Sequence, residues 1–231
     1  TYIYIAIRRG PMKTPTSGTS VFSPLAINNA SGTTNTTGFP IDLQISAERG
    51  SAHITPVSDR LRGVTTVPAD NTSNYLRTDS TSAEQPETIT RYWNNTGFQT
   101  SLFSSGVSSV YWNFQRAPSF MDVVCYTGDS SGTKAISHNL GVAPELYIVK
   151  VRNTSGYDWM VYSASLGNTK SLVLNSTAAS STTIWTWGNT SPTASAFYVT
   201  SDGYVGGAGY NYVAYLFATC SGVSKVGSYT G

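Results

Sequence analysis

The stretch Tyr212-Val213-Ala214-Tyr215-Leu216-Phe217 decides the fold class of this chain. It is a short apolar run, bounded by turn residues and rich in β-branched and aromatic side chains, and such runs are typical of β-strands. Related stretches occur at Tyr2–Ile7 and Val110–Phe114. Aligning positions 3, 110 and 213 gives spacings of 107 and 103 residues, from 110 − 3 and 213 − 110. This spacing predicts an internal repeat about as long as one small domain.

Further blocks keep the same order in the two copies. Phe39–Leu43 corresponds to Ala143–Leu146, and Trp93–Thr96 corresponds to Trp187–Thr190. The stretch Asp122–Gly128, which opens the second copy, returns in altered form near the end of the chain at 225–231. The repeat therefore predicts four parts: a closing strand of a preceding repeat at 1–12, repeat domain 1 at 13–118, repeat domain 2 at 119–222, and the start of a following repeat or linker at 223–231.

The first of these parts raises a question of pairing. A strand without neighbours exposes backbone groups and apolar side chains. We therefore expect the face formed by Ile3, Ile5 and Ile7 to be buried by another unit or another chain. The phase of the repeat and the first residue, Thr1, favour a fragment of a longer protein over a processed chain.

Composition narrows the class of protein. Charged residues make up 11% of the 231 residues and the net charge is +2, so the basic surface expected of a nucleic-acid-binding protein is missing. No apolar run reaches the roughly 18 residues that a membrane span needs, so we expect no membrane insertion. The abundance of Thr, Ser, Asn, Gly and Tyr favours strands joined by polar turns over long helices.

Nine short apolar runs predict the strands themselves. Polar turns such as Asn153–Gly156 and Ser201–Gly203 separate them, and no convincing helix is found. Many short strands with regular turn signals predict an all-β chain built from tandem antiparallel β-sandwich-like domains of about 100 residues each. The expected strands are Tyr2–Ile7, Ile41–Ile45, Val110–Phe114, Leu146–Val151, Trp159–Tyr162, Leu172–Leu174, Ile184–Trp187, Phe197–Thr200 and Tyr212–Phe217.

Metal and cofactor chemistry finds little support in the sequence. The two histidines, His53 and His138, have no second His or Cys at ligand spacing, so we expect no zinc site and no cofactor. Acidic turns at Asp129–Gly132 or Ser201–Gly203 leave a calcium site open, although turn chemistry explains them equally well. The two cysteines, Cys125 and Cys220, lie at different places in the repeat and are expected to be buried or half-buried free thiols.

Catalysis is not expected, and no catalytic residue is assigned. Neither histidine lies in a nucleophile motif. Glycoside hydrolysis needs only two carboxylates, for which Asp59 with Asp79, or Glu84 with Glu87, are the candidates. In the turn Asp59–Gly63, however, an Arg–Asp pair that orders the chain is the simpler interpretation.

Aromatic residues are the richer signal, with 15 Tyr, five Trp and eight Phe. Most of them, and the tryptophans above all, fall in expected strands, where core packing or contact between units is their usual role. Tyr and Trp also suit sugar rings and protein surfaces, because they combine a large rigid area with a polar group. Tyr157, Tyr204 and Tyr210, in glycine-rich loops, are therefore the candidate binding residues.

Several of these blocks resemble one known family. The blocks Tyr4–Met12, Arg116–Gly128, Leu140–Leu146 and Tyr212–Ala218 resemble a repeated domain of large tail-associated virion proteins in bacteriophages, particularly marine and cyanobacterial phages. The resemblance covers nearly the whole chain. It implies a structural and adhesive component of a virion, in a tail fibre or tail appendage outside the cell, that contacts the host surface.

The resemblance also implies partners and leaves alternatives open. The expected partners are other copies of the chain, as a trimer in many such fibres, other virion proteins, and a glycan or protein of the host surface. A capsid decoration or other particle-lattice subunit would use the same modules. A carbohydrate-binding module is the second alternative, favoured if exposed Tyr and Trp line one groove.

Overall fold

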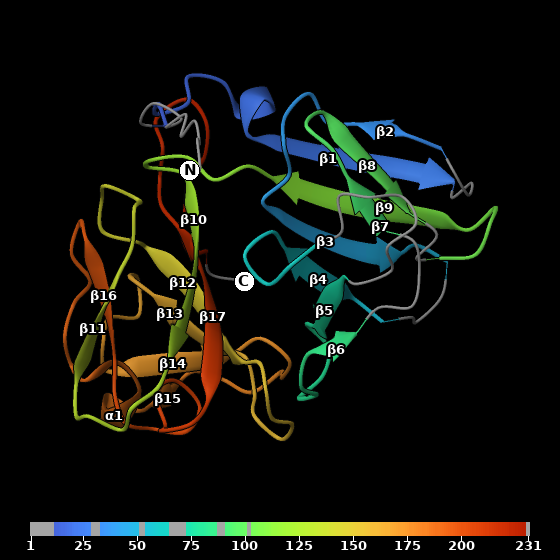
Figure 1. The fold of residues 1–231 in the computed structure, drawn as a ribbon. Helices are drawn as coiled ribbons and strands as arrows, with labels where there is room; N and C mark the ends of the chain where they lie inside the picture. The colour runs from blue at the N-terminus through green and yellow to red at the C-terminus, as the bar shows by residue number, and fades with distance from the viewer. Residues whose placement is uncertain are drawn as a thin grey trace, which may run out of the picture.

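A computed structural model describes residues 12–28, 33–50, 54–64, 73–86, 91–100 and 103–229 (Figure 1). The expected strand with Ile3, Ile5 and Ile7 lies outside the described residues, as does His53. Nearly all regular structure is antiparallel β-sheet, which confirms the all-β sandwich class.

The chain forms two six-stranded sheets, and we call the part through Phe114 the first half and the part from Met121 the second half (Figure 1). The first sheet has the order β1-β9-β3-β4-β5-β6. Its strands are β1 (Phe22–Asn28), β3 (Leu43–Glu48), β4 (Pro56–Asp59), β5 (Asn74–Arg77), β6 (Gln85–Pro86) and β9 (Ser108–Phe114).

The second sheet has the order β10-β17-β12-β13-β14-β15, which matches the first sheet with the last strand of each half in second place: counted from the start of each half, the orders are 1-9-3-4-5-6 and 1-8-3-4-5-6. In both sheets the last long strand of the half lies between its first and second long strands. The strands are β10 (Met121–Thr127), β12 (Leu146–Val151), β13 (Met160–Ser163), β14 (Lys170–Val173), β15 (Ser181–Thr182) and β17 (Asn211–Phe217).

A smaller sheet covers one face of each large sheet. In the first half it consists of β2 (Asn35–Thr36), β8 (Gly97–Thr100) and β7 (Arg91–Trp93), and in the second half of β11 (Lys134–Ser137) and β16 (Ala196–Val199). Tyr111 packs with Trp93 and Phe98 in the first of these cores. Tyr147 packs with Trp187 and Phe197 in the second. Each half therefore has a core of its own.

A third core joins the two halves. The large sheets turn their remaining faces toward each other, and Leu43, Val57 and Leu76 of the first pack with Val213 and Tyr215 of the second. The alternation along β17 shows how the sequence builds both layers: Tyr212, Ala214 and Leu216 belong to the core of the second half, whereas Val213 and Tyr215 belong to the shared core.

The connection that follows each of the strands β9 and β17 has the same form. After β9 an isolated bridge joins Ala117 to Met121, and after β17 one joins Cys220 to Ser224. The middle residue of each bridged segment has a positive φ, 63° at Ser119 and 75° at Gly222. The expected free thiols are found, with Cys220 buried and Cys125 half-buried.

One expected strand is wrong. Ile184–Trp187 forms a single helical turn, α1, instead of a strand. The turn ends at Gly188, which has the left-handed φ of 61° that a helix C-terminus favours. It buries Trp187 against Tyr147 and Tyr162, whereas Trp185 on the other side is 62% exposed.

Candidate functional site

The structure brings the three predicted binding residues together. Tyr157 comes from the loop between β12 and β13, and Tyr204 and Tyr210 come from the glycine-rich loop before β17. The ring centroid of Tyr157 lies 5.2 Å from that of Tyr204 and 5.1 Å from that of Tyr210, and the Tyr157 hydroxyl donates to the Tyr210 hydroxyl over 2.9 Å. We call these three residues the tyrosine cluster.

The cluster is half-buried and packs on the core of the second half. Its position depends on glycines, because a Cβ at Gly203 would lie 3.1 Å from the Tyr157 ring and one at Gly207 would lie 3.1 Å from the Tyr210 ring. The Tyr212 hydroxyl fixes the same loop by donating to Gly203 O and accepting from Gly207 N, both over 2.8 Å. The cluster is therefore a preformed aromatic surface.

Asp202 begins the loop that carries two of these tyrosines. Its carbonyl accepts from the backbone N–H groups of the three residues 205–207, and its Oδ1 accepts from Tyr204 N over 3.0 Å. Hydrogen bonding to Tyr210 raises the pKa of Tyr157, so the Tyr157 phenol stays neutral and available as a hydrogen-bonding group near neutral pH. The surface can thus offer ring area and hydroxyl groups to a polar partner.

The acidic turns considered for calcium are occupied by other bonds. Asp129 pairs with Lys134 over 2.5 Å and accepts from Ser131, which together hold the pKa of its carboxyl below the usual range. Within the described ranges, no group of three His, Cys, Asp or Glu residues lies close enough to hold a metal ion.

The carboxylates considered for catalysis are also engaged in ion pairs. Asp59 is fully buried and pairs with Arg62 over 2.5 Å, Asp79 pairs with Arg77 over 2.8 Å, and Glu84 pairs with Arg152 over 2.7 Å. Glu87 lies outside the described residues. The expected Arg–Asp pair that orders the turn after β4 is present, with Arg62 N also donating to Asp59 Oδ1.

His138 is buried and has backbone partners. Its Nε2 lies 3.2 Å from Thr193 O, and its Nδ1 accepts from Leu140 N over 3.2 Å. Burial lowers its pKa. These contacts give His138 a structural role in the loop before β12.

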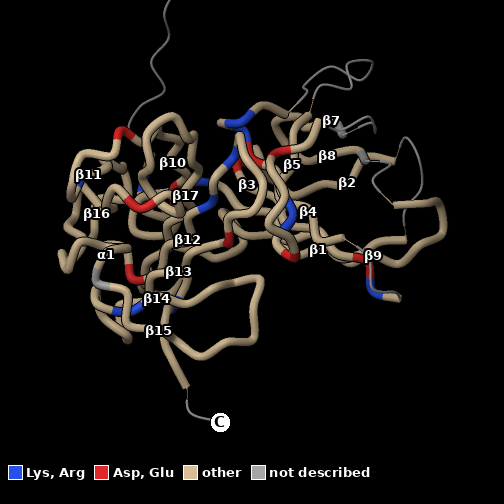
Figure 2. Tube along the Cα trace, turned by 90° about the horizontal axis from the view of Figure 1, so that it is seen from below, with Lys and Arg blue, Asp and Glu red and all other residues tan. Residues whose placement is uncertain are grey.

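The sequence did not predict the polar contacts that join the two halves, which we call the seam. The loop 78–84 of the first half lies along the loop 152–159 of the second, with backbone bonds from Glu84 N to Arg152 O (2.7 Å) and from Gly156 N to Thr81 O (3.0 Å). The Trp159 indole donates to Arg77 O over 2.8 Å, and the Tyr215 hydroxyl donates to Asp59 Oδ2 over 2.7 Å. Figure 2 shows acidic and basic positions interspersed along the chain, several of them where the halves meet.

Lys150 is the buried amine of the seam. Its Nζ donates to Tyr157 O over 2.8 Å and to Thr81 O over 3.4 Å, so it links the tyrosine-bearing loop to the first half. Burial lowers the pKa of Lys150 to about 8, and Asp158 opposes that shift.

The lowered pKa of Lys150 predicts that the free energy of unfolding depends on pH. Between pH 8 and 10.5 the unfolded chain binds the Lys150 proton and the folded chain releases it, so the free energy of unfolding rises with pH in that window. We expect the wild-type chain to gain stability relative to Lys150→Met as the pH increases from 8 to 10, measured by urea unfolding. Lys170→Met, at an exposed lysine, is the matched control for the removal of one positive charge. A constant difference between the wild type and Lys150→Met across this range would contradict the prediction.

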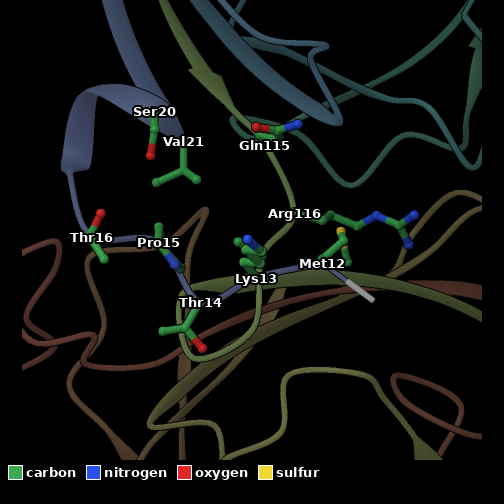
Figure 3. Close-up of a pocket in the computed structure, with 10 residues that line it drawn as sticks. Met12, Lys13, Thr14, Pro15, Thr16, Ser20, Val21, Gln115 and Arg116 are labelled. Carbon is green, nitrogen blue, oxygen red and sulfur yellow. The ribbon is translucent and has the colours of Figure 1, made fainter. Parts of the chain in front are cut away.

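Figure 3 shows a separate surface groove of about 450 Å³, where the segment 12–16 passes beneath the start of β1. Lys13 and Gln115 border it, and Arg116 lies at its edge. Arg116 is already occupied, with its Nη1 3.6 Å from Asp122 and its Nε 3.8 Å from Asp42. The groove therefore offers few directed groups to a ligand.

Comparison with known proteins gives one match. Residues 115–231, just over half of the chain, match the model of a family described as a domain of unknown function (DUF7483). No curated protein and no solved structure matches the chain. No helix in the described part of the chain is long and apolar enough to cross a membrane.

Proposed function

Because the chain belongs to the DUF7483 family, whose description leaves the function open, we propose its role from its own seam and surface. We propose a non-enzymatic, structural and adhesive component of a bacteriophage virion, in a tail fibre or tail appendage that contacts the host surface. The family resemblance of the repeated blocks supports the virion, and the structure supports the mechanical and adhesive parts.

The observation that carries the structural part is the contact between the two halves, which comprises the shared apolar core and the seam. Two sheets with one strand order share an apolar core, and backbone bonds, ion pairs and a buried indole cross between them. Inter-domain contacts within one chain usually permit relative motion unless they are large and apolar. A pair of halves joined through a common core suits a stiff module of an extended appendage.

The tyrosine cluster supports the adhesive part. Its rings are held by glycine contacts and by the Lys150 bond to Tyr157 O, so little ordering is required when a partner binds. Several copies in one particle would add the weak contacts of single sites into firm attachment.

The virion location is tested on purified phage particles from a culture in which the gene for this chain is present. Antibodies against the purified chain should label tail appendages in immunogold electron microscopy, and the chain should sediment with infectious particles in a density gradient. Labelling over the capsid would indicate a capsid decoration protein instead of a tail appendage. Finding the chain only in the soluble fraction would refute the virion proposal.

The adhesive part predicts that Tyr204→Ala and Tyr210→Ala reduce binding to host cells. Each variant removes a ring from the preformed surface, and loss of one aromatic contact at a binding site weakens affinity by about tenfold or more. Binding of the fluorescently labelled chain to host cells measures the effect. Tyr229→Ala is the matched control, since Tyr229 is 96% exposed and outside the cluster. Equal binding by all variants would remove the cluster from the adhesive surface.

A further inference from the structure

A small polar pocket lies where the two halves meet, beside the start of the 152–159 loop. Its volume is about 300 Å³, at the lower end of the range of ligand sites in proteins. Both halves line it, with Asn74, Glu84 and Pro86 from the first and Arg152, Asn153 and Asn211 from the second.

The seam holds the lining side chains in place. Glu84 accepts from Arg152 Nε over 2.7 Å, and the Glu84 backbone N–H donates to Arg152 O over 2.7 Å. Asn153 donates to Gly209 O over 3.0 Å and accepts from Asn211 N over 2.9 Å. The pocket is therefore fixed before any ligand arrives, and Asn153 connects it to the loop that carries Tyr210.

The pocket offers both kinds of hydrogen-bonding group. Among the contacts of the described residues, Asn211 Nδ2 and Arg152 Nη1 have no acceptor and Asn74 Oδ1 has no donor. The charge of Glu84 is balanced by Arg152, and Asp59 with Arg62 forms a second balanced pair whose Arg62 Nη1 lies 4.0 Å from Glu84. Planar donors and acceptors thus meet in a site without net charge.

We propose that this pocket binds one residue of a neutral sugar. Adjacent hydroxyl groups of a sugar both donate and accept, which matches a carboxylate beside amide and guanidinium groups. An anionic ligand would meet Glu84, and a cationic ligand would meet Arg152. Pro86 supplies an apolar contact for the C–H face of the ring. The inference extends the adhesive part of the proposed function and does not depend on the virion location.

The test is a titration of the isotopically labelled chain followed by two-dimensional NMR. The neutral probes are glucose, galactose, mannose and N-acetylglucosamine, and the charged probes are glucuronic acid and glucosamine. At least one neutral sugar should shift the side-chain amide signals of Asn74, Asn153 and Asn211 and bind more tightly than both charged probes. Tighter binding of a charged probe, or no shift of these signals by any neutral sugar up to its solubility limit, would overturn the proposal.

Two variants locate the site. Asn211→Ala removes a free donor at an exposed position, and Glu84→Gln replaces the charged acceptor with an amide of the same shape; each should weaken sugar binding about tenfold. Asn168→Ala is the matched control, because its amide donates to Ser191 Oγ over 3.1 Å and the residue does not line the pocket. Unchanged affinity in both pocket variants, with spectra that show an intact fold, would also overturn the proposal. If the sugar binds but the chain is absent from particles, the virion role fails while this inference stands. If Tyr204→Ala loses host binding but no sugar binds the pocket, this inference fails while the adhesive part of the proposed function stands.

Discussion

Asp59→Ala is expected to lower the free energy of unfolding by about 3–5 kcal/mol, because it leaves a buried guanidinium without its carboxylate. The side chains of Asp59 and Arg62 are both fully buried, and the hydrogen-bond partners that Arg62 retains, Val57 O over 2.9 Å and the Tyr215 hydroxyl over 3.1 Å, are neutral. The remaining carboxylate, Glu84, lies 4.0 Å from Arg62 Nη1, too far for a hydrogen bond. Burial lowers the pKa of Arg62, but Tyr215, Asp59 and Glu84 together raise it beyond its already high value, so the guanidinium stays charged. Urea unfolding followed by fluorescence measures the loss.

The exposed pair Arg77–Asp79 is the matched control. The two side chains are 33% and 40% exposed, so Asp79→Ala should change the free energy of unfolding by about 1 kcal/mol or less. A second variant separates lost charge pairing from lost packing: Asp59→Ala combined with Arg62→Met should be more stable than Asp59→Ala alone, since the unpaired charge is gone. If the double variant is the less stable of the two, the unpaired cation is not the cause.

Trp159→Ala is expected to cost about 3–5 kcal/mol and to loosen the two halves from each other. Trp159 is 1% exposed, stacks on Tyr215 at 6.3 Å between ring centroids, and donates its indole N–H to Arg77 O and Ser80 O of the first half. Its removal therefore opens a cavity in the shared core and takes the indole N–H away from both carbonyls, of which Arg77 O still accepts from Ser80 N over 3.3 Å. Hydrogen exchange should show faster exchange in β4 and β5 than in β11 and β16.

Trp185→Ala provides the comparison. Trp185 is the exposed tryptophan on α1, and its loss should change the free energy of unfolding by about 0.5 kcal/mol or less. Equal destabilisation by both substitutions, or uniform hydrogen exchange after Trp159→Ala, would show that the seam does not depend on this indole.

The sequence predicted the long central strands well and the edge strands poorly. Leu146–Val151 has the expected bounds, and β17 begins one residue earlier than expected, because continuous apolar runs are clear in strands buried on both faces. β1 was missing from the expected strands, since Pro24 interrupts its pattern; a proline is tolerated there because β1 lies at the edge of its sheet. α1 was mistaken for a strand because a helix of four residues shows no helical period.

The residues of the candidate site also fall into a part that the sequence predicted and a part that it did not. Local chemistry predicted Tyr157, Tyr204 and Tyr210 one by one and the Asp59–Arg62 turn as a pair. Contacts between distant segments had no local signal: Tyr215 reaches Asp59 across 156 residues, and Glu84 reaches Arg152 across 68. Such pairs depend on how the two sheets face each other, which no spacing in the sequence reveals.

The way the two large sheets face each other sets a rule for any longer assembly. In each half one face of the large sheet is covered by its own small sheet, and the opposite face meets the other half. The contact therefore joins corresponding faces of the two halves. It buries that face on both sides and leaves none of it free for a third half, as an isologous dimer contact does. A filament of such units would therefore elongate through other surfaces and would have the pair, rather than the single half, as its building block.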